Sequence, residues 1–95
     1  MRREITFIKK RAEDYLNSNT FTYIKEVING RENFYNGFVI KVYYDLLVFF
    51  DIKLKREFPI RYESIEVIEP SKKDIEIKTA WEIYQQNRKE AENGK

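Results

Sequence analysis

The sequence predicts a mainly β fold, in which five short, strongly bent strands form a small barrel between an N-terminal and a C-terminal helix. Between residues 20 and 70 the chain is rich in β-branched and aromatic residues, in runs that are separated by turn signals. Gly37 within one of these runs, and two prolines within or beside others, favour bends and strand edges. Helical spacing is found only before and after this stretch, so residues 1–95 are expected to form one domain.

Residues 3–17 are expected to form the first helix, because apolar side chains recur at every third or fourth position. The apolar face consists of Ile5, Ile8, Ala12, Tyr15 and Leu16. The polar run Asn-Ser-Asn-Thr at 17–20 then ends the helix, since such side chains compete for backbone hydrogen bonds.

The first two strands are expected around a hairpin. The run FTYIKEVI at 21–28 is rich in β-branched and aromatic residues, and the Asn-Gly pair at 29–30 is a strong turn signal. The second strand is expected over residues 34–45, with Gly37 inside it. A glycine within a strand often marks a bulge or a sharp bend, which small barrels use to turn a corner.

The third strand is expected over residues 46–55, where the two faces differ. One face is entirely apolar, whereas the other changes from apolar to charged along the strand. This pattern is typical of a strand that crosses a barrel and runs out towards water. In this arrangement Asp45 would cap a turn and Asp51 would point outward.

Two further strands complete the expected barrel. The run EFPIRY at 57–62 contains Pro59, which confines this strand to an edge or an irregular position because proline has no N–H to donate. Residues 64–69 alternate as a fifth strand, which stops at Pro70. The barrel therefore covers about residues 20–70.

The last element is expected to be a helix over about residues 80–91. Thr79 and Glu82 have the spacing of a capping box, which indicates a helix start, and Trp81 and Tyr84 are its expected buried residues. The sequence DIEIK at 74–78 fits either a sixth strand or the beginning of this helix.

The composition excludes several kinds of site. The chain has no cysteine and no histidine, which removes disulfides, thiol nucleophiles, histidine-dependent triads and nearly all structural zinc sites. Without a glycine-rich phosphate loop or metal-ligand spacing, we expect neither an enzyme nor a cofactor or metal. A net charge of +2 does not by itself predict nucleic-acid binding. No apolar run is long enough to span a bilayer, so a soluble cytoplasmic protein without a membrane partner is expected.

Four segments carry a family resemblance: NGRE at 29–32, Gly37 with FVIKV, YYDLLVFFD at 43–51 and IRYESIEVIEP at 60–70. Over about residues 20–70 they resemble the Sm-like (LSm) branch of the SH3-like small β-barrels. In that family a glycine turn leads to a glycine-bent second strand, and an aromatic or His, an apolar residue and an Asn precede the third strand. An Arg-Gly pair follows the fourth strand. The resemblance implies an RNA-binding barrel that closes into rings through strand pairing between subunits.

The resemblance also implies a nucleic-acid site with Tyr43, Asp45 and Arg61. Tyr43 stands at the family's base-stacking position, and an aromatic ring suits that role because every base has a π-face. Asp45 stands where the family has Asn, and an ionised Asp accepts hydrogen bonds but cannot donate them. Arg61 retains the family's arginine, whereas Tyr62 replaces the glycine after it. These departures alter the usual uridine pocket.

The densest basic cluster lies in the first helix. Arg3 and Lys10, two helical turns apart, could face phosphate and add salt-dependent affinity for RNA. The alternative for this cluster is a solvated helix face. Tyr43 and Tyr44 could likewise only cover a barrel rim, and Arg61 could pair with a neighbouring glutamate.

Two functions are expected from these features. The first is a non-catalytic Sm-like protein that binds single-stranded RNA or assembles with RNA-processing proteins, as a homo-oligomeric ring. The alternative is an SH3-like protein-interaction or assembly adaptor that binds no nucleic acid, anchored by aromatic residues at its rim.

Overall fold

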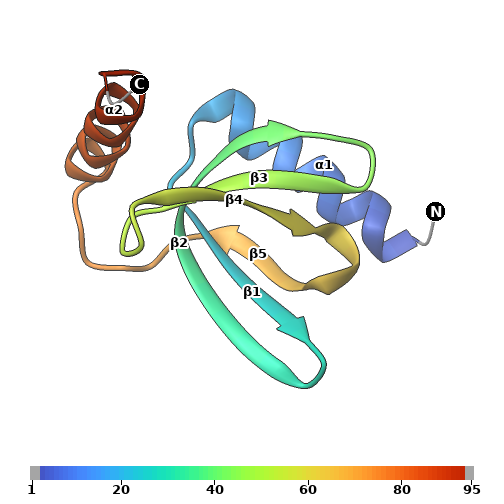
Figure 1. Ribbon diagram of the computed structural model, residues 1–95. Coiled ribbons are helices and arrows are strands. Elements are labelled where there is room, and N and C mark those ends of the chain that lie inside the picture. Colours follow the sequence, from blue (N-terminus) through green and yellow to red (C-terminus); the bar gives the residue numbers. More distant parts are fainter. Residues whose placement is uncertain (1–2, 94–95) are drawn as a thin grey trace.

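The computed structural model of the protein describes residues 3–93, where two helices flank one five-stranded antiparallel sheet (Figure 1). The elements are α1 (Arg3–Ser18), β1 (Thr22–Ile28), β2 (Arg31–Val42), β3 (Leu46–Asp51), β4 (Arg56–Arg61), the 3-10 helix η1 (Tyr62–Ser64), β5 (Ile65–Pro70) and α2 (Ile77–Asn93). The predicted mainly β class, the five strands and the two helices are therefore confirmed.

The strands lie in the order β4-β3-β2-β1-β5, so β4 and β5 are the two edges of the sheet. β2 connects the halves of the sheet, because residues 31–37 pair with β1 and residues 37–42 pair with β3. It begins and ends earlier than the predicted 34–45, and it curves along its length in Figure 1. Within the described residues no pairing joins β4 to β5, so the sheet is open. The edge position predicted from Pro59 is confirmed.

Gly37 lies at the point where β2 has β1 on one side and β3 on the other. A Cβ atom here would overlap the carbonyl oxygen of Phe50, so the close approach of β3 requires a glycine. The irregularity in the β2–β3 pairing falls downstream, between Val39 and Lys41. The glycine thus serves close strand packing, and the bulge is at a separate position.

The central strands are buried on both faces of the sheet, and a different helix covers each face. Successive residues of a strand point to opposite faces, so Phe38 and Val39 of β2 enter different clusters. The buried residues of the α1 cluster are Ala12, Ile24, Val39, Leu47, Phe49, Ile60, Tyr62, Ile65 and Ile68. The buried residues of the α2 cluster are Phe21, Phe38, Phe50, Ile52, Ala80 and Tyr84. α1 and α2 therefore hold the sheet between them.

β3 ends at Asp51, short of the predicted end at Lys55, because Asp51 organises the turn that follows. One carboxylate oxygen of Asp51 accepts the N–H of Leu54 at 2.7 Å, and the other accepts the N–H of Asn36 in β2 at 3.0 Å. Lys55 has a φ of 55°, which is not a strand conformation. The expectation that Asp51 points outward is wrong: the side chain is buried, and two backbone donors satisfy it.

α2 begins at Ile77, earlier than the predicted start near residue 80. Thr79 therefore lies inside the first turn and does not cap it, and residues 74–76 form no strand. The expected packing of the helix is confirmed, since the ring centroids of Trp81 and Phe38 are 5.1 Å apart and Tyr84 is buried. Within residues 3–93, neither helix has the length and apolar character needed to cross a membrane.

Candidate functional site

The turn between β2 and β3 meets the connection between β4 and β5, and this junction holds most of the predicted site. The buried Tyr62 joins the two segments: its hydroxyl donates a hydrogen bond to the Tyr43 carbonyl oxygen at 2.7 Å. Its backbone N–H also donates to the Asp45 carbonyl oxygen at 3.3 Å. Tyr62 thus brings together Tyr43, Asp45 and Arg61. From the sequence, Tyr62 was expected only to replace the glycine of the family's Arg-Gly pair.

A shallow hollow of about 190 Å³ opens at this junction. It is lined by Ile5, Tyr44, Asp45, Arg61 and Glu63, and we call these residues together with Tyr43 the rim. Tyr44 is 74% exposed and Tyr43 is 49% exposed, so both rings offer surface to a ligand. The aromatic residue that lines the hollow is Tyr44 and not the predicted Tyr43.

Charges of both signs lie at the rim. Arg61 Nη1 is 3.8 Å from Asp45 Oδ2, and both side chains are more than half exposed. Such exposed pairs contribute only about 0–1 kcal/mol, so Arg61 can leave Asp45 at little cost. Glu63 adds a second carboxylate to the same hollow. The rim is therefore not a strongly positive surface.

A further cation reaches the rim from α1. Lys9 Nζ lies 5.3 Å from the centroid of the Tyr44 ring, within the range of a cation–π contact. This contact could not be predicted from the sequence, because Lys9 and Tyr44 are far apart along the chain and meet only after folding. Neither Lys9 nor Tyr44 is among the predicted site residues, although Tyr44 was considered with Tyr43 and Lys9 belongs to the basic cluster of the first helix.

The two predicted basic residues of α1 do not join the rim within the described side chains. Lys10 Nζ forms an ion pair with Asp14 Oδ1 at 2.9 Å, one turn along the same helix. The hydrogen bond and the negative charge of Asp14 raise the pKa of Lys10. Arg3 begins α1, but its side chain lies outside the described part of the chain.

The link made by Tyr62 persists over a wide pH range. Burial of the Tyr62 side chain raises its pKa to about 12, and the carboxylates of Glu13 and Asp45 add to this rise. The hydroxyl therefore stays protonated at neutral pH and keeps its hydrogen bond to Tyr43. The two connections that form the rim are held together under ordinary conditions.

No protein-family model matches the chain, and a search of curated proteins found no similar sequence. Within residues 3–93, no three side chains of His, Cys, Asp or Glu gather in a way that could hold a metal ion. Function must therefore be inferred from the geometry of this chain.

Proposed function

We propose that this chain is a non-catalytic small barrel of the Sm-like kind that binds single-stranded RNA at the rim. The supporting observation is that two exposed tyrosines and two cations gather there: Tyr43 and Tyr44, Arg61, and Lys9 from α1. Exposed aromatic rings beside positive side chains suit a single strand, because bases stack on the rings while cations contact the backbone.

Stacking is the larger part of this proposed affinity. A base on Tyr44 contributes roughly 1–3 kcal/mol, and Tyr43, the preceding residue, offers a second exposed ring. Lys9 and Arg61 contact phosphates, while Asp45 and Glu63 offset part of their charge. Two phosphate contacts on a single strand should make the binding constant depend on salt. A plot of its logarithm against the logarithm of salt concentration should have a slope of about −1.4.

The test is fluorescence anisotropy with labelled oligouridine and a mixed-sequence single strand at several salt concentrations. Tyr44→Ala should weaken binding about tenfold, because one stacking contact is lost. Arg61→Ala should weaken binding and reduce the salt slope by about 0.7, because one phosphate contact is lost.

Matched controls lie away from the rim. Phe34→Ala removes an exposed aromatic ring of β2 outside the rim, and Arg56→Ala removes an arginine from the other end of β4. Both controls should bind RNA as the unchanged chain does. The proposal fails if no RNA binds at low salt, or if the rim variants bind as well as their controls.

A further inference from the structure

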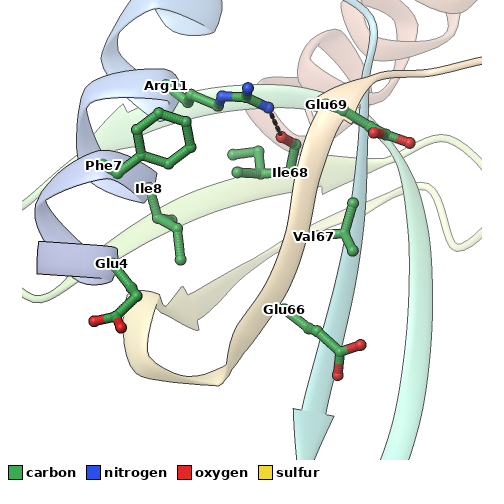
Figure 2. Close-up of a pocket in the computed structure, with 8 residues that line it drawn as sticks. All are labelled: Glu4, Phe7, Ile8, Arg11, Glu66, Val67, Ile68 and Glu69. Carbon is green, nitrogen blue, oxygen red and sulfur yellow. Dashed lines mark hydrogen bonds between the residues drawn. The ribbon is translucent and has the colours of Figure 1, made fainter.

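A second hollow, of about 480 Å³, lies between α1 and the edge strand β5, and no rim residue lines it (Figure 2). We call it the α1–β5 groove. From α1, Phe7 and Ile8 point towards the strand, and Ile68 points back towards them, whereas the side chain of Val67 points away from α1. Phe7 is 57% exposed although it is a large apolar residue. The groove therefore presents an apolar surface that the fold itself leaves open.

Arg11 fixes the shape of this groove. Its Nη1 donates a hydrogen bond to the carbonyl oxygen of Ile68 at 2.9 Å, which ties α1 to the strand, as Figure 2 shows. Its guanidinium carbon also lies 4.7 Å from the centroid of the Phe7 ring. The Phe7 ring is thus held in place before any partner arrives, which lowers the entropy cost of binding.

The groove carries negative charge. Glu4, Glu66 and Glu69 line it, against the guanidinium of Arg11, although the carboxylates of Glu66 and Glu69 point away from α1 in Figure 2. Lys25 bridges to Glu66 at 3.0 Å, but it is shared with Glu32 at 2.7 Å, so this cation does not neutralise both carboxylates. An acidic surface repels RNA phosphates and attracts lysine and arginine side chains, so the charge favours a protein partner with basic residues.

The free edge of β5 offers little for backbone pairing. The N–H of Ser71 donates a hydrogen bond to the carbonyl oxygen of Phe21 at 2.9 Å, so the backbone groups of Ser71 point towards β1. Because backbone groups alternate in direction along a strand, those of Pro70 and Ile68 point away from β1, towards the free edge. Pro70 has no N–H to donate, and Arg11 already occupies the Ile68 carbonyl, so these two residues leave only the Ile68 N–H and the Pro70 carbonyl for a partner. A partner in the groove must therefore be held mainly by side-chain contacts.

A second copy of the chain is a poor occupant for the same reason. The other free edge of the sheet, which a second copy would offer, is β4. Just after β4, the N–H of Tyr62 donates to the carbonyl oxygen of Asp45, so the backbone groups of Tyr62 point towards β3. Strand alternation then turns Pro59 outward, so this edge also lacks a donor at its centre. Pairing between the two edges would leave hydrogen-bonding groups without partners.

We propose that the α1–β5 groove docks a basic, amphipathic segment of a partner protein. An apolar side chain of that segment fills the space between Phe7, Ile8 and Ile68, and its lysine or arginine side chains lie beside Glu4 and Glu66. This site is separate from the proposed RNA-binding rim and does not depend on it. It would make the chain an adaptor with one surface for a protein.

The test is selection from a displayed library of short random peptides on the full chain, with counter-selection on Phe7→Ala. Enriched peptides should carry an apolar residue flanked by lysine or arginine. A labelled peptide of this kind should shift backbone amide signals of α1 and β5 in an NMR titration and leave those of the β2–β3 turn unchanged.

Affinity of the selected peptide then tests the contacts. Phe7→Ala should weaken binding at least about tenfold, whereas Phe34→Ala, which removes an aromatic ring of nearly equal exposure (58%), should not. The pair Glu4→Gln and Glu66→Gln should weaken binding and reduce its salt dependence, whereas Glu57→Gln on β4 should do neither.

Each contrary result overturns the proposal. These results are a selection that enriches no peptide, enrichment of acidic peptides, and equal binding by Phe7→Ala and Phe34→Ala. Concentration-dependent shifts of groove signals without peptide would instead assign the groove to a second copy of the chain. Shifts of the same signals by oligouridine would assign it to RNA. Loss of RNA binding at the rim would leave the groove proposal unaffected.

Discussion

Gly30 and Gly37 are both needed by the fold, for different physical reasons. Gly30 has a φ of 77°, in the left-handed region, and nothing lies within 4 Å of the place where a Cβ would stand. Gly37 instead has the Phe50 carbonyl at that place. Gly30→Ala should therefore lower the free energy of unfolding by about 1 kcal/mol, through backbone strain alone. Gly37→Ala should lower it by about 3 kcal/mol or more, because β2 and β3 must separate. Urea denaturation measures both, and equal losses would contradict this explanation.

Tyr35 and Tyr62 should make stability depend on alkaline pH. Burial raises the pKa of each from 10.0 to about 12, and the hydrogen bond that Tyr35 donates to Glu26 adds to its rise. A raised pKa in the folded state means that folding favours the protonated hydroxyl. This stabilisation is fully present below about pH 10 and is lost as pH rises through about 12.

Urea denaturation at several pH values between these limits should show the free energy of unfolding falling with pH. Tyr62→Phe keeps the ring but removes the titrating hydroxyl, so this variant should show a shallower fall. It should also cost about 1 kcal/mol at neutral pH, because the bond to the Tyr43 carbonyl is lost. A fall that is unchanged in Tyr62→Phe would show that this hydroxyl is not responsible.

At the scale of elements, the sequence predicted what is local and missed what depends on contacts between distant residues. The helices and strands follow from apolar spacing, and Pro59 correctly placed its strand at an edge. The end of β3 was missed, because Asp51 is fixed by Asn36 of another strand. The start of α2 was left open over residues 74–78, and the structure places it at Ile77, three residues before the start predicted from the capping box, because such a spacing does not distinguish a first turn from a cap.

The candidate site was predictable to a similar degree. The resemblance grouped Tyr43, Asp45 and Arg61, and the fold brings them together through Tyr62. The groove was missed, because Phe7 lies off the main apolar face of α1. A signal was present in the sequence, however: Glu4, Phe7 and Arg11 recur at helical spacing and form a second stripe. What covers such a stripe is decided by β5, which the helix sequence does not reveal.

At the scale of the whole molecule, charge separates the two candidate surfaces. The rim combines exposed tyrosines with Lys9 and Arg61, while the groove combines an exposed Phe7 with three glutamates. The net charge of +2 does not reveal this difference, because it sums the charges of the whole chain. Under the two proposals, the chain would connect an RNA to a basic protein segment.

The same sheet edges decide the oligomeric state. A ring of the kind that the resemblance implies would pair β4 of one copy with β5 of the next, since these are the free edges. Both edges have a proline facing outward, and Arg11 occupies a carbonyl of β5. We therefore expect the unchanged chain to be monomeric by light scattering at micromolar concentration.

Removing the obstacles on β5 should promote association. Arg11→Ala frees the Ile68 carbonyl, and Pro70→Val restores an N–H on the same edge, so the double variant should gain mass with rising concentration. Lys10→Ala is the matched control, because it removes a neighbouring α1 cation that pairs only within the helix. A ring formed by the unchanged chain would show that a neighbouring strand displaces Arg11 from the Ile68 carbonyl. Equal masses for the double variant and Lys10→Ala would show that these two residues are not what keeps the β5 edge unpaired.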